Sequence, residues 1–484
     1  MTTEQHNEPQ AQADGMNAEE GPGFRFPNVY IILVAFIGLA ALATYLVPGG
    51  EYERIDGPEG RITIDPDSFT YVDANPTSFL QFMTAVPQGI LDAGEVVIFT
   101  LMIGGVFAVL RATGIIELAV GALSRRFANR SMVMLALLMV VFGVVATLIG
   151  TQELSLIYVP VILPLIIALR FDSVTAAAVA LCATTAGFAA GVLNPINTGL
   201  GQQLSGIPLY SGAAVRIAVF VVALTAAILM VVRYARRVSA DPAASLLAGD
   251  PAEARKRAEF RDVLDEETAP ATTRQKLASV ATLLFLIALV LGVTLAGWFM
   301  MEMAGLFILM GAAVGLMAGL SGNQICAAFD KGFREVLVGA LIAGVARGVA
   351  VVLEDGNILD TIVHGLGVLV GGLPVALSAV GMFLAQLVFN FVVPSGSGQA
   401  LVTVPIMAPL ADVLGMTRQT AVLAYQLGDG FGNILYPTSG YFMAVLALAG
   451  VRWQKWVRFF LPLFAIWVGI AMVFLIGVQL AGWA

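Results

Sequence analysis

Long apolar stretches, separated by short polar ones, run along almost the whole chain. Several are roughly 18 or more residues long, which as a helix is enough to cross the ~30 Å hydrocarbon core of a bilayer. The pattern therefore predicts an all-α polytopic membrane protein. The predicted spans are residues 28–47, 93–112, 173–195, 211–232, 276–299, 303–320, 335–353 and 456–481.

Two further apolar regions, 131–170 and 374–413, are interrupted halfway by Gly, Ser, Pro or charged residues. A spanning helix rarely carries such residues at its centre, because backbone groups exposed to lipid lose their hydrogen bonds. We expect each region to enter and leave on the same face, as a re-entrant helical hairpin.

Polar segments divide the chain into two halves. Residues 1–27 are polar and acidic, so a disordered cytoplasmic tail is expected. They lack the basic start of a cleaved signal peptide, so the first apolar run should remain as a helix. Residues 236–275 are rich in Ala, Glu and Arg and predict a cytoplasmic linker. The first transmembrane repeat is then 28–235, and a linking helix with the second repeat occupies 276–484.

The charges of the loops predict how the chain is oriented across the membrane. The 48–78 loop is strongly acidic, whereas Arg and Lys gather near 125–130, in the 238–275 linker and at 452–458. Basic loops stay in the cytoplasm. The N-terminus is therefore predicted to be cytoplasmic, with the acidic loop outside.

The two halves share an ordered set of short matches. Val159 to Leu165 (VPVILPL) matches Val404 to Leu410 (VPIMAPL), and Gly187-Phe188 matches Gly430-Phe431. The predicted topology opens the two hairpins toward opposite faces. The sequence thus predicts two inverted repeats, each with a re-entrant helical hairpin and a broken transmembrane helix, which is the architecture of many secondary carriers.

Four predicted helix breaks, at 150–153, 194–199, 390–399 and 429–440, are rich in side chains that suit a binding site. Freed carbonyls suit Na⁺, and the N-termini of half-helices suit a carboxylate. A charge within a membrane helix is functional by default, although Arg347 has the alternative of pairing with a carboxylate to lock helices. The candidate substrate- or ion-binding residues are Thr151, Gln152, Glu153, Asn194, Asn197, Thr198, Arg347, Asn390, Ser395, Ser397, Gln399, Asp429, Asn433, Thr438 and Ser439.

Composition and missing motifs narrow the function. The chain is 58% hydrophobic and 12% charged, too apolar for a soluble protein of 484 residues. It has no Gly-x-x-x-x-Gly-Lys-Ser/Thr loop, no His-Glu-x-x-His and no Gly-x-Ser-x-Gly elbow, which disfavours a primary pump or a hydrolase. A channel or a receptor-like sensor stays open as an alternative to a carrier. No cofactor, no metal beyond a Na⁺ site, and no nucleic-acid partner are expected.

Several polar strings resemble the YfcC family, which groups with the C4-dicarboxylate anaerobic (DcuC-like) carriers of the ion transporter superfamily. The resemblance covers nearly all of the chain from about residue 25. It is carried by Pro394 to Ala400 (PSGSGQA), Gly428 to Phe431 (GDGF), Pro437 to Gly440 (PTSG), Ala346 to Gly348 (ARG) and Pro48 to Tyr52 (PGGEY).

The resemblance implies a scaffold region, a transport region with two hairpins, and often a homodimer, in the bacterial cytoplasmic (inner) membrane. It also implies an ion-coupled secondary transporter of small carboxylate-bearing solutes, with Na⁺ or H⁺ as the coupling ion. Relatives are described as basic amino acid antiporters or as C4-dicarboxylate carriers. An amino acid is the first expectation and a dicarboxylate the second.

Overall fold

The computed structural model describes residues 29–56, 62–116, 118–119, 130–265, 271–296, 298 and 300–483. The predicted disordered tail, 1–27, lies outside these residues. The described part is overwhelmingly helical, with two small two-stranded sheets, so the all-α prediction is confirmed. Within it, seven helices are long and apolar enough to cross a membrane: α4 (Gly94–Ala112), α6 (Ser131–Ile149), α8 (Ser173–Ala190), α10 (Ala213–Ala240), α13 (Met300–Ala318), α14 (Gly322–Asp355) and α20 (Trp453–Ala481).

One group of helices is built around α14. This helix packs against α2 (Val29–Ala43), α3 (Phe79–Asp92), α4 and α13, while α12 (Thr273–Ala296) packs against α13. Glycines allow the close approach: a Cβ on Gly104 would lie 2.8 Å from the carbonyl oxygen of Gly332. Small residues are the usual means by which membrane helices come together.

A second group is centred on α8 and on α18 (Arg418–Gly432). Every residue of α8 is buried, as is every residue of α18 from Gln419 to Gly432. Both helices are surrounded by protein rather than lipid, which is why small residues fill α8 and why polar side chains are tolerated along α18. α6, α10 and α7 (Ser155–Ala168) cover α8, whereas α20, α16 (Val375–Val392) and α17 (Gly396–Val413) cover α18.

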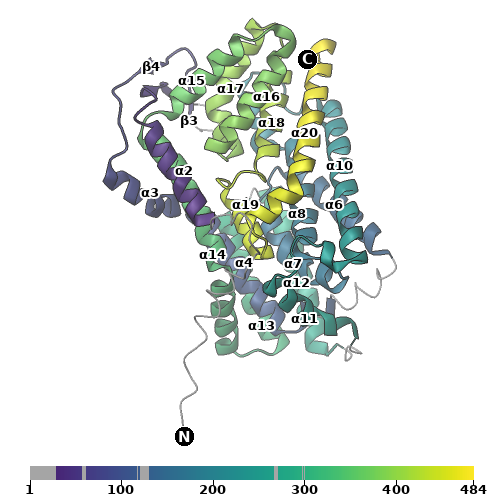
Figure 1. Ribbon diagram of the computed structural model, residues 1–484. Coiled ribbons are helices and arrows are strands. Elements are labelled where there is room, and N and C mark those ends of the chain that lie inside the picture. Colours follow the sequence, from purple (N-terminus) through teal and green to yellow (C-terminus); the bar gives the residue numbers. More distant parts are fainter. Residues whose placement is uncertain are drawn as a thin grey trace.

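Two helix pairs fall within the ranges expected for hairpins. α6 and α7 are joined by five residues at 150–154, and α16 and α17 by three residues at 393–395. Each second arm contains two prolines, Pro160 and Pro164 in α7 and Pro405 and Pro409 in α17. Figure 1 shows α16 and α17 near the top of the molecule and α7 lower down, toward α11. The inverted relation between the halves stays a prediction.

Each central helix is followed by a break and a short helix. α8 ends at Gly191, which has a left-handed φ of 55°, and is followed by a π-helical turn, η3 (Pro195–Gly199), and α9 (Leu200–Leu204). α18 ends at Gly432, and after an irregular stretch α19 (Gly440–Ala449) begins.

The two ends of the molecule carry different caps. At the top of Figure 1, β1 (Gly50–Glu51) pairs with β4 (Thr70–Tyr71), and β2 (Arg54–Asp56) pairs with β3 (Ile62–Ile64), beside α15 (Leu359–Gly371). The Arg54 guanidinium lies 3.0 Å from the buried Asp360 carboxylate of α15. Burial, and then this carboxylate, raise the pKa of the neighbouring Tyr52 phenol well above its usual value. Tyr52 therefore stays neutral.

The 236–275 segment forms the cap at the opposite end. α10 continues to Ala240, and a short 3₁₀ turn, η4 (Pro242–Ala244), and the helix α11 (Pro251–Asp265) follow. The buried Glu253 carboxylate accepts hydrogen bonds from the Ser173 backbone N–H (3.1 Å) and hydroxyl (2.5 Å) at the start of α8. Lys256 donates to the Ala449 carbonyl at the end of α19 (2.6 Å). The segment is therefore folded onto the helices around α8.

Candidate functional site

The first hairpin tip lies against both breaks. Gly150 ends α6 with φ 82°, and a Cβ there would overlap Oδ1 of Asn194, so only glycine fits. Beyond it, Thr151 donates a hydrogen bond to the Glu153 carboxylate. Gln152 donates through Nε2 to the Gly430 carbonyl (3.3 Å) and accepts from the Tyr441 hydroxyl. Gly430 is in the last turn of α18, whose carbonyls have no partner within the helix.

The break after α8 joins the two halves. The Asn194 side chain caps the π-helical turn by accepting from the Asn197 N–H (2.9 Å). Thr198 donates to Gln426 Oε1 on α18 (3.3 Å), and Gln426 in turn donates to the Phe188 carbonyl on α8 (2.7 Å). The break is therefore fixed by polar bonds to α18, in the other half of the chain.

The second hairpin tip rests on the same break. Ser395 caps α17 by accepting from the Gly398 N–H (3.4 Å). A Cβ on Gly396 would overlap Nδ2 of Asn197, so the tip and the π-helical turn are in direct contact. The Tyr425 hydroxyl donates to the Gly396 carbonyl (2.6 Å). Ser395 is exposed and Ser397 half-buried, while Gln399 is fully buried.

The most polar cluster surrounds Asp429. Nδ2 of Asn390, near the end of α16, lies 3.0 Å from Asp429 Oδ1, 3.1 Å from Asn433 Oδ1 and 3.4 Å from Gln399 Oε1. Asn433 also donates to Asp429 Oδ1 (3.4 Å). All four side chains are buried.

The carboxylate of Asp429 is only partly satisfied in this cluster. The Asn390 amide has two hydrogens for three neighbouring oxygens. Among the described residues, Asp429 Oδ2 and Asn390 Oδ1 are buried without a hydrogen-bond partner, and so is the donor Nε2 of Gln386. A buried carboxylate oxygen left in this state is strongly unfavourable. The arrangement therefore suits a bound cation, whether a metal ion, a proton or an ammonium group.

The break after α18 is held by side chains from elsewhere. Thr438 donates to the Phe391 carbonyl at the end of α16 (2.8 Å), and the ring nitrogens of Trp453 and Trp456 donate to carbonyls of the unwound stretch. Ser439 Oγ is buried without a hydrogen-bond partner. These contacts fix the irregular stretch 433–439 in place and do not involve Asp429.

Arg347 is the one predicted site residue that is not on these tips and breaks. It lies on α14, where its guanidinium is 3.1 Å from Glu354 and 4.0 Å from Asp92 of α3. Its side chain is 32% exposed. Arg347 thus pairs with carboxylates of α14 and α3, as the alternative interpretation expects, and its role as a ligand stays a prediction. The hydrogen bonds of Asp429 come from Asn390 and Asn433.

Sequence reasoning missed several polar residues that line the cluster. Gln386 accepts from Gln399 (2.7 Å) and Thr403 (3.1 Å), and Tyr425, Gln426 and Tyr441 bond the tips or the break. Gln386 and Tyr425 lie within helices, away from a Gly- or Pro-rich break, whereas Tyr441 directly follows Gly440. The available signal was an amide or phenol inside an otherwise apolar helix.

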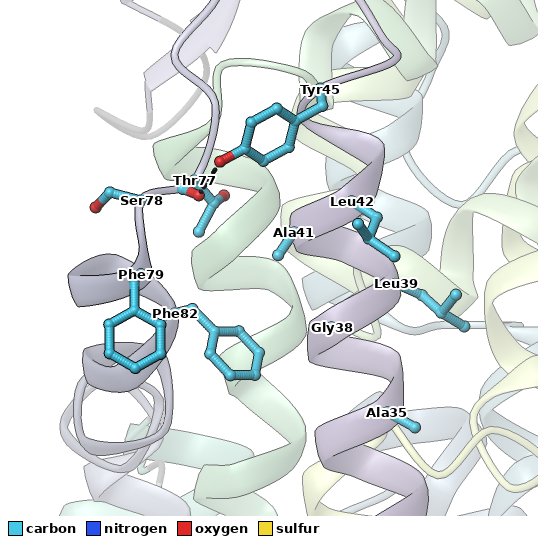
Figure 2. Close-up of a pocket in the computed structure, with 10 residues that line it drawn as sticks. All are labelled: Ala35, Gly38, Leu39, Ala41, Leu42, Tyr45, Thr77, Ser78, Phe79 and Phe82. Atoms are coloured by element: carbon cyan, nitrogen blue, oxygen red, sulfur yellow. Dashed lines mark hydrogen bonds between the residues drawn. The ribbon is translucent and has the colours of Figure 1, made fainter.

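A surface groove lies apart from this site, between α2 and α3. It encloses about 670 Å³ and is lined mainly by apolar side chains such as Leu39, Leu42 and Phe82. Figure 2 shows Tyr45 reaching across its upper end to Thr77, whose carbonyl accepts the phenol proton at 2.9 Å. The described residues contain no group of three or more His, Cys, Asp or Glu that could hold a metal.

Known proteins match over nearly the full length. The family model described as "C4-dicarboxylate anaerobic carrier" (DcuC) matches residues 26–480. Escherichia coli (strain K12) YfcC, whose name proposes a basic amino acid antiporter, is 30% identical over 94% of this chain and 97% of its own. An uncharacterized Haemophilus influenzae protein is 26% identical, with the same coverages.

Two solved transporters are more distant. The Alcanivorax borkumensis YdaH transporter has a TM-score of 0.41 and 14% identity, covering 94% of this chain and 99% of its own. Neisseria gonorrhoeae MtrF, described as one of a class of antimetabolite efflux pumps, has a TM-score of 0.39 and 15% identity, covering 94% and 95%.

The apolar helices, the paired helix breaks and the matches together define a multi-pass membrane transporter rather than an enzyme. The chain belongs to the DcuC family of C4-dicarboxylate anaerobic carriers, and the predicted family resemblance is confirmed.

Proposed function

We propose that this chain is an ion-coupled secondary active transporter of small carboxylate-bearing solutes, with an amino acid as the first candidate. The observation that carries the proposal is the buried carboxylate of Asp429, one oxygen of which lacks a hydrogen-bond partner among the described residues. A coupling Na⁺ or H⁺, or the ammonium of an amino acid, would supply the missing positive charge. The name of the relative YfcC supports antiport of basic amino acids.

A C4-dicarboxylate is the second candidate. The description of the family model supports it, and so does a buried guanidinium, Arg216, for which the described residues provide no anion. With two negative charges, a dicarboxylate would need cations at the cluster around Asp429, so this candidate requires ion coupling more strictly than a cationic amino acid does.

We further propose the setting of the protein in the bacterial inner membrane. The basic linker cap around α11 would face the cytoplasm with the N-terminus, and the acidic strands β1–β4 would face outward. Lipid surrounds the apolar outer helices, and a homodimer is the assembly we expect.

The proposal is tested on purified, full-length protein. A thermal-shift screen of basic amino acids and C4-dicarboxylates, each with and without Na⁺, should find a stabilising solute, because a ligand that binds only the folded state raises the melting temperature. Proteoliposomes loaded with that solute should then show saturable counterflow. Conductance far above the turnover of a carrier would indicate a channel and overturn the proposal.

A further inference from the structure

A buried arginine without a partner lies outside the site described above. Arg216 is in the first turn of α10 and is fully buried, and Nε, Nη1 and Nη2 of its guanidinium have no hydrogen-bond partner among the residues that the structure describes. A guanidinium stays charged and carries five N–H donors. Buried charges are normally paired, because an unpaired one loses its hydration without compensation. The group therefore lacks an anion in this conformation.

Arg216 faces the interior of the transport region. It is on the buried stripe of α10 that also contains Val219 and Ala223. The Ala223 carbonyl accepts from the Trp467 ring nitrogen (3.0 Å), and Trp467 stacks on Phe431, with ring centroids 4.9 Å apart. Phe431 is two residues from Asp429. Arg216 and Ala223 are seven positions apart in α10, which is a rise of about 10 Å. Arg216 therefore lies closer to the N-terminus of α10 than the level of the site.

Both broken helices meet the start of α10. Ser211, just before α10, accepts through its hydroxyl from Gln419 Nε2 on α18 (2.6 Å). Its carbonyl accepts from Gln202 Nε2 on α9 (3.0 Å). Movement of α9 or of the first turn of α18 would thus be transmitted to the residues just before the turn that carries Arg216. The N-terminus of a long helix adds a positive partial charge at the same place.

Neither the internal repeat nor a bound lipid accounts for the burial of Arg216. The dipeptide Val215-Arg216 has a match in the second half, Val457-Arg458, and Arg458 is exposed, so the predicted repeat does not require burial. Arg216 is fully buried and does not line the apolar surface groove of about 500 Å³ between α10 and α20, so its guanidinium does not face lipid in this conformation.

We propose that Arg216 is a carboxylate-binding residue of the transport pathway. When the first turns of α10 and α18 separate, the guanidinium of Arg216 becomes accessible. It then binds a solute carboxylate through paired, charge-assisted hydrogen bonds. The site depends on the proposed function for the solute's passage, but carboxylate binding at Arg216 is measurable without transport.

The direct test is labelling of full-length protein with phenylglyoxal, which modifies accessible guanidinium groups, followed by mass spectrometry of Arg216 and Arg458. Arg216 should label slowly, and acetate or succinate, present at ten times its dissociation constant, should slow this labelling about tenfold. Labelling of Arg458 should be unaffected. No labelling of Arg216, or labelling that no carboxylate slows, would overturn the proposal. So would protection only by phosphatidylglycerol, tested in nanodiscs against phosphatidylcholine.

Variants separate binding from folding. Arg216→Met removes a buried charge, so its melting temperature should be equal or higher, while the protecting carboxylate should bind about 10-fold to 100-fold more weakly by thermal shift. Arg216→Lys should be intermediate, and Arg458→Met should match wild type. Wild-type affinity in Arg216→Met would assign Arg216 a structural role. If a carboxylate protects Arg216 from labelling but the protein shows no counterflow, the proposed transport is refuted and the carboxylate site at Arg216 still stands.

Discussion

Ser397 is half-buried in the first turn of α17, between the capping Ser395 and the buried Gln399. Ser397→Leu would place an apolar side chain beside the contact of the second tip with Asn197. We expect solute uptake into proteoliposomes to be lost with little loss of folded protein, because the helices that pack the hairpin are unchanged. Ser279→Leu, on an exposed position of α12, is the matched control and should transport normally. Normal uptake by Ser397→Leu would mean that the tip is only a turn.

Single residues were predictable where the backbone breaks. Glycine, proline and hydroxyl residues in an apolar run indicated the tips and breaks, and Asp429 was found because a charge in such a helix is costly. Partners of residues were not predictable, because they depend on tertiary packing. The ion pair of Arg347 with Asp92, and the bond of Gln152 to Gly430, join positions far apart in the chain.

The strand β3 supports the second hairpin at a point where the helix cannot support itself. Pro405 has no N–H, so the Leu401 carbonyl one turn earlier lacks its helical partner. The buried Thr63 hydroxyl of β3 donates to this carbonyl at 2.8 Å. The acidic loop is thereby attached to an arm of the hairpin.

Thr63→Val should therefore destabilise the protein by about 0.5–1.5 kcal/mol, the net contribution of one hydrogen bond to a partly buried acceptor. The measurement is the melting temperature, with Thr70→Val on the exposed strand β4 as the control. Pro405→Ala restores an N–H for Leu401, so the effect of Thr63→Val should shrink in the Pro405→Ala background. An equal loss of stability in both backgrounds would contradict this role.

Helices were predicted more reliably than their ends. The apolar run at 335–353 belongs to α14, which begins at Gly322 because Ser321 and Gln324 form a capping box before it. The run at 173–195 was too long, because Gly191 ends α8 in a left-handed conformation. Hydropathy detects the membrane-crossing part of a helix, whereas capping decides where it starts and stops.

At the scale of the whole molecule, the strands β1–β4 and the helix α11 form caps at opposite ends (Figure 1). In a Cys326→Ser background, which removes the exposed native cysteine, Asp67→Cys should react with a membrane-impermeant thiol reagent from outside intact cells. Ala254→Cys on α11 should react only after the membrane is opened. The reverse pattern would contradict the proposed orientation and the placement of basic residues inside.

Asp429 is the acidic centre of the proposed transport site. Asp429→Asn keeps the size of the side chain and removes its charge, and since Asp429 is bonded to Asn390 and Asn433 and not to Arg347, the change leaves no unpaired cation. The decisive measurement is ion-coupled uptake of the solute in proteoliposomes, with the melting temperature measured in parallel and the exposed Asp330→Asn as a control. We predict a folded protein of unchanged melting temperature without concentrative uptake. Normal ion-coupled uptake by Asp429→Asn would contradict the account.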